Sequence, residues 1–349
     1  MDIQSIQTAI EAIRAPYAEK RENIFEVTAR LEGGRLVLAG KVLEAAQKEV
    51  LLAGLRERFP EMEVDAGGVA VVRQGSPRLL TVATNLTSMH AGPSFLAEMV
   101  TQLVNGMQVE MLEEQGRWVY ARRWSQPENR LDALDHYIGW TYRPYLDEQP
   151  APPPTHLVVE PVGLLRAEPR SNAALVTRVL GGTAVAVSEQ HEDWACLALA
   201  GNTRGWLPTA HLRPLNALPI TERDRRARLV EDALTFIGVP YLWGGGSANG
   251  IDCSGFAQLL HRLIGIALPR DADMQYAAGR PVEPPFLPGD LLFFGEQGEQ
   301  RRITHVGISL GGWQIIHSSR SRNGVQIDDV QANAGLREIY LCAATYIGR

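Results

Sequence analysis

The stretch PYLWGGGSANGIDCSGFAQLLHRLIG, Pro240 to Gly265, places a single cysteine between a run of glycines and the start of a helix. From Ser254 onward, apolar residues recur every three or four positions until Gly265, which predicts an amphipathic helix. Asp252 is a suitable N-cap, so Cys253 is expected in the first helical turn. Unpaired backbone N–H groups and the helix dipole there favour a thiolate. We therefore expect Cys253 to be a nucleophile with a lowered pKa.

Two histidines follow in segments with strand character, His305 in ITHVGIS and His317 in IIHSS. Alternation places His305 on the less apolar face of its strand. A two-residue turn at Gly311-Gly312 would put the histidines on opposite faces, whereas a three-residue turn or a bulge would oppose them directly. A catalytic interpretation, in which His305 is the base and His317 orients it, requires the second arrangement.

Other interpretations of these residues fit less well. A zinc site of Cys253, His305 and His317 would lack the usual close ligand spacing. The glycines at 244–246 are not followed by Lys-Ser/Thr, so a phosphate loop is a weak match, and we expect them to let a substrate backbone come close. Cys196 and Cys342 are expected to be small core residues.

Length and composition narrow the class of protein. The chain has 349 residues, enough for several domains, with 45% hydrophobic and 21% charged residues. A net charge of −6 argues against non-specific binding to nucleic acid or to a membrane surface. The first residues lack the basic and apolar regions of a signal peptide, and no stretch has the apolar length of a membrane span, so we expect a cytoplasmic protein.

The middle of the chain contains an internal repeat. Three residues recur at an offset of 76 positions, and a Gly-Trp pair that ends each copy recurs at an offset of 66, so the first copy carries ten extra residues. We place them within Arg123–Tyr137. Short alternating strands in each copy predict a small antiparallel barrel. The matched residues are Val100 and Val176, Gly106 and Gly182, Trp118 and Trp194, and the pairs Gly139-Trp140 and Gly205-Trp206.

These patterns predict an α+β protein of four domains. Residues 1–68 read as a small α/β domain of unknown role, and residues 69–148 and 155–216 as the two barrels, joined by a stiff proline-rich spacer. Residues 217–349 carry the cysteine and both histidines. In this last domain we expect a helix from Thr221 to Gly238 with Leu229, Val230, Ala233, Leu234 and Ile237 on its apolar face.

The last domain resembles the NlpC/P60 cysteine peptidases, bacterial cell-wall hydrolases with a papain-like fold. The resemblance rests on YLWGGGSANGIDCSGFAQ, LPGDLLFFG, ITHVGISLGG and IIHSS, in this order and spacing. With two modules similar to bacterial SH3 domains before it, the chain is similar to γ-D-glutamyl-L-diamino-acid endopeptidases. Those enzymes cut murein peptides between D-Glu and the diamino acid, and they act on peptides with a free N-terminal L-Ala.

The resemblance implies a role for several residues. Cys253 would be the nucleophile, His305 the base and His317 the group that orients the imidazole, with no metal or cofactor. The partner would be a murein tri- or tetrapeptide with a free N-terminal L-Ala.

Substrate contacts are implied as well. Tyr241 would help to hold the oxyanion, Asp252 would pair with the L-Ala ammonium and Ser254 would contact the D-Glu carboxylate. Tyr137 of the first module would close the groove near the amine, where no matching acidic residue is evident. Trp243 fits a place in the site or in the core, and Arg270 with Asp271 fits a surface ion pair.

The function that follows is a cytoplasmic murein-peptide endopeptidase of cell-wall recycling. An exported wall hydrolase whose modules bind murein remains an alternative. So do a catalytically dead murein-peptide binding protein and a thiol acyltransferase of the same fold that uses an amine in place of water.

Overall fold

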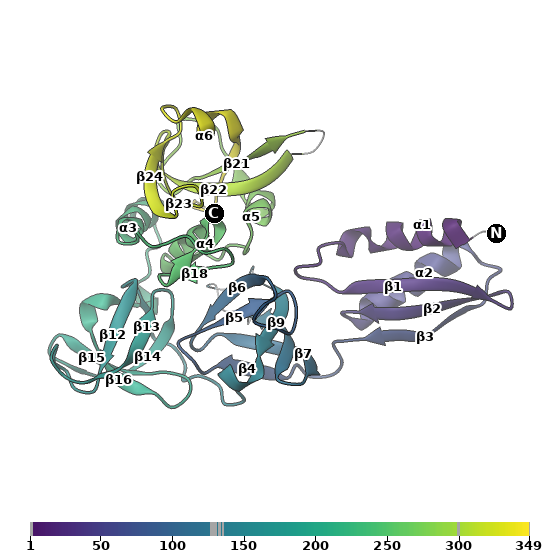
Figure 1. Ribbon diagram of the computed structural model, residues 1–349, viewed down its shortest axis with the longest axis horizontal. Coiled ribbons are helices and arrows are strands. Elements are labelled where there is room, and N and C mark those ends of the chain that lie inside the picture. Colours follow the sequence, from purple (N-terminus) through teal and green to yellow (C-terminus); the bar gives the residue numbers. More distant parts are fainter. Residues whose placement is uncertain (1–2, 126–130, 132–133, 135, 299–300, 349) are drawn as a thin grey trace.

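The structure is a computed structural model that describes residues 3–125, 131, 134, 136–298 and 301–348. It is a mixed α+β protein with several separate sheets, arranged in chain order as an N-terminal domain, two β-modules and a C-terminal domain (Figure 1). The ten extra residues of the first repeat fall between β8 and β9, mostly on residues outside the described ones.

The N-terminal domain packs two helices on a three-stranded sheet of order β1-β2-β3. The β1–β2 hairpin turns at Gly33 and Gly34, both with positive φ, and β2 runs parallel to β3 after the helical crossover. Strand β3 continues to Val71, beyond the boundary expected at residue 68. The elements are α1 (Ile3–Arg14), β1 (Phe25–Glu32), β2 (Arg35–Val42), α2 (Ala45–Arg58) and β3 (Val64–Val71).

The two repeats fold into modules with the same strand order. The first is β10-β4-β7-β8-β9-β5-β6, and the second, read from its last strand, is β17-β11-β14-β15-β16-β12-β13. Each strand of the first module thus has the same place in its sheet as the strand of the second module whose number is higher by seven, for example β4 and β11. The strands are β4 (Leu79–Val82), β5 (Leu86–His90), β6 (Met99–Val104), β7 (Gln108–Gln115), β8 (Trp118–Trp124), β9 (Ile138–Tyr142), β10 (Leu146–Asp147), β11 (His156–Val158), β12 (Val162–Arg166), β13 (Leu175–Leu180), β14 (Ala184–His191), β15 (Trp194–Ala198), β16 (Arg204–Pro208) and β17 (Leu212–Pro214).

The two modules also have an equivalent glycine turn, and they are in contact with each other. Gly106 and Gly182, which the repeat aligns, both have φ above +80°, a conformation that favours glycine. The amide of Asn85 donates a hydrogen bond of 2.7 Å to the hydroxyl of Thr177, which joins the first module to β13 of the second. The repeat seen in the sequence is therefore a repeat of structure.

The C-terminal domain places helices against a six-stranded sheet of order β20-β25-β21-β22-β23-β24. One core cluster fills the space between α4 and the inner face of the sheet. The last strand, β25, begins directly after helix α6. The elements are α3 (Glu222–Leu234), β18 (Gly246–Ser247), β19 (Gly250–Ile251), α4 (Cys253–Leu263), α5 (Ala272–Ala278), β20 (Arg280–Pro281), β21 (Leu291–Gln297), β22 (Arg301–Gly311), β23 (Gln314–Ser319), β24 (Gly324–Asp329), α6 (Ala334–Ile339) and β25 (Tyr340–Thr345).

Helix α3 begins at its predicted cap and buries only part of the predicted face. The hydroxyl of Thr221 accepts the backbone N–H of Asp224, as expected of an N-cap. Leu234 and Ile237 are exposed, whereas Arg226 and Asp232 are buried and paired with Asp290 and Arg213 respectively. The predicted face is thus confirmed at Leu229 and Ala233 and wrong at Leu234 and Ile237, because buried ion pairs occupy positions that hydrophobic periodicity leaves to solvent.

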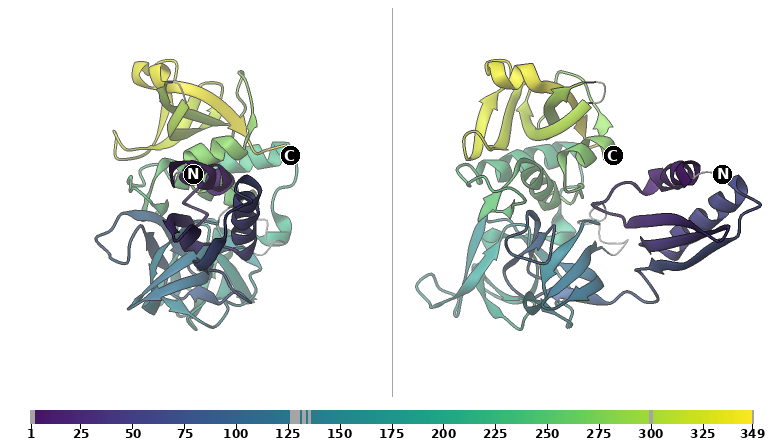
Figure 2. Two further views of the ribbon diagram at one scale, coloured as in Figure 1. Left: turned by 90° about the vertical axis from the view of Figure 1, so that its right-hand side faces the viewer. Right: turned by 45° about the vertical axis from the view of Figure 1, so that its right-hand side comes forward.

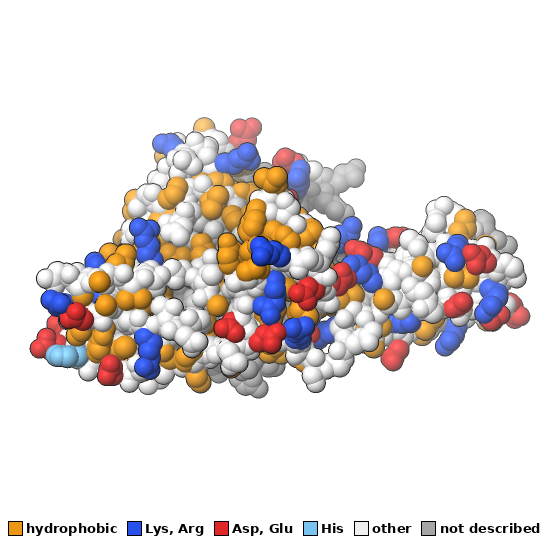
Figure 3. Space-filling model, turned by 60° about the horizontal axis from the view of Figure 1, so that its bottom comes forward, with side chains coloured by type: hydrophobic (Ala, Val, Ile, Leu, Met, Phe, Trp, Pro, Cys, Tyr) orange, Lys and Arg blue, Asp and Glu red, His pale blue; other side chains and the backbone are white. Residues whose placement is uncertain are grey.

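The domains are not packed evenly. The N-terminal domain projects as an arm from the side of the first module, and the loop after α1 reaches back towards α5 (Figures 1 and 2). On the face shown in Figure 3, acidic and basic side chains are interspersed along this arm, and hydrophobic side chains gather nearer the middle of the molecule. No helix among the described residues is long and apolar enough to cross a membrane.

Candidate active site

Cys253 is the first residue of α4, as predicted, and Asp252 is its N-cap. The Asp252 carboxylate accepts the backbone N–H of Gly255 at 2.7 Å and that of Gly244 at 2.9 Å. Asp252 therefore fixes both the first helical turn and the glycine loop before it. A side chain at Gly255 would place its Cβ 2.2 Å from the carbonyl oxygen of Gly245, so only glycine allows this close packing.

A buried arginine completes the environment of Asp252. Arg270 donates to both carboxylate oxygens of Asp252, at 3.0 and 2.6 Å, and to the hydroxyl of Ser254 at 2.9 Å. Arg270 is 2% exposed, so the expected surface ion pair is wrong. The fork of a guanidinium matches a carboxylate in this way. The geometry favours capping and arginine binding as the role of Asp252 over binding of an ammonium group.

The thiol of Cys253 lies in a largely apolar environment. Its sulfur accepts backbone N–H groups of Val306 and Ser254, which favour the thiolate. Burial nevertheless raises the pKa of Cys253 to about 12, and the negative charge of Asp252 adds to the rise. The expectation of a lowered thiol pKa was wrong, because the helix terminus acts on a thiol that is only 9% exposed.

His305 and His317 lie on one face of the sheet and touch. The ring nitrogens His305 Nε2 and His317 Nδ1 are 2.7 Å apart. The strands meet at a two-residue turn with a bulge at Leu310, and the register continues so that Gly307 lies beside His317. The histidines are therefore diagonal neighbours on one face, in a register that differs from both predicted ones, since Gly307 rather than His305 or Val306 lies opposite His317.

A carboxylate follows the two histidines. His317 Nε2 is 3.0 Å from Asp328 Oδ2, at the end of β24. An ionised carboxylate only accepts hydrogen bonds, so His317 carries its proton on Nε2 and accepts through Nδ1. His305 must then donate from Nε2, which leaves His305 Nδ1 with a free lone pair.

Burial strongly affects the protonation states of the hydrogen-bonded groups His305, His317 and Asp328. It lowers the pKa of His305 to about 3, with a further contribution from His317. It also lowers the pKa of His317, although the Asp328 carboxylate opposes this. Burial would raise the pKa of Asp328, but hydrogen bonds from His317 and Asn333 outweigh it and the pKa is lowered. At neutral pH the resting state is a neutral thiol, two neutral imidazoles and an ionised carboxylate.

Tyr241 and Trp243 lie on the loop that precedes Cys253. Tyr241 is half-buried, and burial, with the nearby Cys253 and Asp252, raises its pKa to about 12. It is therefore a hydroxyl donor close to the thiol. Trp243 is 57% exposed, which excludes core packing, and its indole N–H donates to Glu98 of the first module at 2.7 Å.

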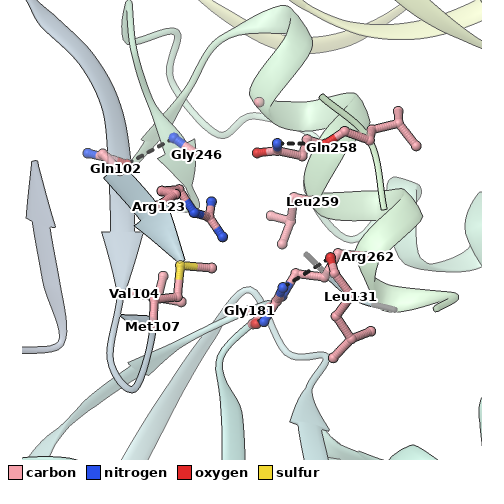
Figure 4. Close-up of a pocket in the computed structure, with 13 residues that line it drawn as sticks. Gln102, Val104, Met107, Arg123, Leu131, Gly181, Gly246, Gln258, Leu259 and Arg262 are labelled. Atoms are coloured by element: carbon pink, nitrogen blue, oxygen red, sulfur yellow. Dashed lines mark hydrogen bonds between the residues drawn. The ribbon is translucent and has the colours of Figure 1, made fainter. Parts of the chain in front are cut away.

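The first module docks directly on the glycine loop. A Cβ at Gly244, whose φ is +73°, would lie 2.3 Å from the carbonyl oxygen of Met99 in β6. Gln102 Oε1 accepts the N–H of Gly246 and the hydroxyl of Ser247, each at 3.0 Å. Figure 4 shows the first of these bonds beside a small cavity between β6 and α4. Gly244 thus accommodates β6 of the first module, where we expected a substrate backbone.

Tyr137 also reaches the C-terminal domain. It is 6% exposed, and its hydroxyl donates to Asp271 Oδ2 at 3.2 Å. Burial raises the pKa of Tyr137, and the charge of Asp271 adds to the rise. Arg21 of the N-terminal domain binds the same Asp271 oxygen at 2.8 Å. Three domains therefore meet at Asp271.

Sequence reasoning missed Asp328 and Arg21, and it placed Arg270 on the surface. Only alternation in GVQIDD, which puts Gln326 and Asp328 on one face of β24, indicates which acid faces His317. Within the described ranges, no group of three or more His, Cys, Asp or Glu side chains is arranged to hold a metal ion.

Comparisons with known proteins identify the family of the chain. The NlpC/P60 family pattern matches residues 238–343. A γ-D-glutamyl-L-lysine dipeptidyl-peptidase of Bacillus subtilis is 30% identical over 65% of this chain and 74% of its own, and dipeptidyl-peptidase 6 of Lysinibacillus sphaericus is 28% identical over 71% and 90%. The crystal structure of an NlpC/P60 protein from Bacillus cereus superposes with a TM-score of 0.66, at 22% identity, over 77% of this chain and 99% of that one. The chain belongs to the NlpC/P60 family and is a cysteine peptidase.

Proposed function

We propose that the protein is a γ-D-glutamyl-L-diamino-acid endopeptidase that cleaves short murein peptides after L-Ala-γ-D-Glu. The observation that carries the proposal is the chain His305–His317–Asp328 on the strands against which the Cys253 helix packs. It leaves a basic nitrogen, His305 Nδ1, beside the strand residue that binds the Cys253 sulfur. The names of the relatives above supply the substrate class.

The reaction begins with a proton transfer, because both partners are neutral at rest. His305 Nδ1 takes the thiol proton as Cys253 Sγ attacks the γ-carbonyl carbon of D-Glu. The Tyr241 hydroxyl and backbone N–H groups at the start of α4 stabilise the oxyanion. His305 then protonates the departing amine of the diamino acid, which leaves a thioester on Cys253.

Hydrolysis of the thioester restores the enzyme. His305 Nδ1 takes a proton from water, the resulting hydroxide attacks the thioester carbonyl, and the proton returns to Cys253 Sγ as L-Ala-γ-D-Glu leaves. His317 holds the His305 ring through both steps, and Asp328 keeps His317 in the required tautomer.

The first module supports a preference for small peptides. Through Met99 and Gln102 the module covers one side of the glycine loop, so it would sterically exclude an intact strand of the cell wall there. Glu98, whose carboxylate is bound to Trp243, supplies the acidic group near the site that sequence reasoning did not find. Both features favour a trimmed peptide with a free amine and a role in cytoplasmic cell-wall recycling.

Product analysis tests the proposal. The protein is incubated with L-Ala-γ-D-Glu-diaminopimelate, and mass spectrometry should find L-Ala-D-Glu and the free diamino acid. Cys253→Ala should abolish cleavage, and the N-acetylated peptide should be cut slowly. Absence of cleavage, or equal cleavage by Cys253→Ala, would refute the assignment. Efficient release of peptides from intact murein would favour the exported hydrolase, and cell fractionation would locate the protein.

A further inference from the structure

The loop between α1 and β1 ties the N-terminal domain to the helix beside the active site. Arg21 Nη1 donates to Asp271 Oδ2 at 2.8 Å and to Asp273 Oδ1 at 2.9 Å, while Nη2 donates to Asp273 Oδ2 at 2.7 Å. Glu19 holds the guanidinium from the other side. The Arg21 side chain is 29% exposed, so these ion pairs are only partly screened by solvent.

The backbone fixes the position of this arginine. Its carbonyl oxygen accepts the N–H of Ile138 at 2.7 Å, next to Tyr137 at the start of β9. Ile138 also packs with Ile24 and Leu43 of the N-terminal domain in a small apolar cluster. Arg21 is thus anchored on the first module before its side chain crosses to α5.

Charges alternate from Arg21 to the nucleophile. Asp271 lies between Arg21 and Arg270, and its other oxygen is 3.9 Å from Arg270 Nη1. Arg270 in turn binds Asp252, the cap of the helix that begins with Cys253. Asp271 and Asp252 therefore compete for one buried guanidinium, that of Arg270. Arg21 provides Asp271 with another ion-pair partner.

We propose, on the basis of the function above, that Arg21 is a positioning residue of the peptidase site. By binding Asp271 and Asp273 it holds Asp271 away from Arg270 and leaves Arg270 to Asp252. Without Arg21, the Asp271 carboxylate turns to the nearest remaining cation, Arg270, and draws it from Asp252. The first turn of α4, and with it the Cys253 sulfur, then loses its fixed position. The N-terminal domain contributes to catalysis through this contact.

A double-mutant cycle in the full-length protein tests the proposal. Arg21→Gln should lower kcat by about tenfold with little change in KM, since a displaced nucleophile slows chemistry more than binding. Arg21→Lys should restore part of the loss. In the Asp271→Asn background, Arg21→Gln should have no further effect, because a neutral amide does not compete for Arg270. Arg14→Ala, which removes an exposed pair with Glu11 in the same domain, is the matched control and should behave as wild type.

A structural role alone predicts other results. If Arg21 only fixed the domain, the effects of Arg21→Gln and Asp271→Asn on kcat would multiply within about twofold, and that outcome overturns the proposal. So does a wild-type kcat for Arg21→Gln, or an equal loss in Arg14→Ala. The rate of Cys253 alkylation by iodoacetamide, followed by peptide mapping, gives a readout without substrate. A changed alkylation rate in Arg21→Gln supports the inference even if the peptide substrate was misassigned, and an unchanged rate counts against it.

Discussion

A single carboxylate sets the tautomers of His305 and His317. Asp328 accepts from His317 Nε2, so His317 Nδ1 accepts from His305 Nε2 and the free lone pair is on His305 Nδ1. If the carboxylate is lost, His317 can move its proton to Nδ1 and donate to His305 Nε2. His305 would then carry its proton on Nδ1 and could no longer act as a base.

Replacement of Asp328 should therefore slow chemistry. We expect Asp328→Asn to lower kcat about tenfold and Asp328→Ala about a hundredfold, with KM nearly unchanged. Steady-state kinetics with the tripeptide measures both. Asp329→Asn is the control, because Asp329 is exposed and binds only loop N–H groups in the described structure. A kcat of wild-type size in Asp328→Ala would contradict this role.

The pH dependence of the reaction should be shifted to the acid side. Because burial lowers the pKa of His305 to about 3, its base form persists well below the ordinary value of 6.5. We expect kcat/KM to keep its neutral-pH value down to about pH 5.5 and to fall only below it. Measurements should be limited to pH values at which the protein stays folded. A midpoint at or above pH 6.5 would mean that His305 is not held in this environment.

Sequence patterns identified Cys253 and the two histidines as candidate site residues, but not the residues that hold them. Cysteine and histidine are rare residue types, and here they stand in recognisable positions. Asp328 was missed because two adjacent aspartates differ only in the face of β24 that they occupy. The thiol pKa was mispredicted because burial depends on the packing around Cys253.

Neighbouring elements constrain the three glycines of the loop before α4 to different degrees. Gly244 and Gly245 face backbone oxygens at 2.3 Å from an added Cβ, whereas Gly246 meets nothing closer than 4.0 Å. Three identical residues therefore have unequal roles. Only the approach of β6 and of the β18–β19 turn separates them, and neither is visible in the triplet GGG.

Alanine substitutions should reveal this difference. Gly244→Ala and Gly245→Ala should each lower the free energy of unfolding by about 2 kcal/mol and reduce activity, because the loop must move from β6 or from Gly250. Gly246→Ala should change neither by a measurable amount. Thermal unfolding and peptide hydrolysis report the two quantities. Equal effects at all three positions would show that the docking of β6 is not what constrains the loop.

Element boundaries were largely predictable, and burial was not. Thr221, Asp252 and Gly265 marked helix ends correctly because capping is a local interaction. The buried side of α3 was predicted only in part, because Arg226 and Asp232 are buried with partners outside the helix.

Buried histidines make the whole molecule sensitive to acid. His261 is fully buried in α4, and burial lowers its pKa to about 4. The unfolded chain binds this proton at about pH 6.5, so the unfolded state takes up more protons as pH falls from 6.5 to 4. Stability is thus fully present above pH 6.5 and is lost progressively below it.

Stability measurements at two pH values test this. The contribution of His261 alone should reduce the free energy of unfolding by about 2 kcal/mol between pH 7.5 and pH 5. His261→Gln should remove that part of the pH dependence, whatever its effect at pH 7.5, while the exposed His191→Gln should leave it unchanged. Urea unfolding of the three proteins gives the comparison. An identical pH dependence in His261→Gln would contradict the assignment.

The repeat was visible at the scale of the whole chain, because matching glycines and tryptophans keep their spacing. The contact of Arg21 with Asp271 could not be predicted, because the two residues are 250 positions apart and no sequence pattern in either segment indicates the other as a partner.

The same strand position of each module serves as a point of attachment. Thr101 and Gln102 of β6 bind the C-terminal domain, and the corresponding residues of β13 are Thr177, which binds the first module, and Arg178. Gly246 and Ser247 present donors, which glutamine can accept and arginine, having no acceptor, cannot. Arg178 of the second module therefore cannot make the contact that Gln102 of the first module makes with the glycine loop.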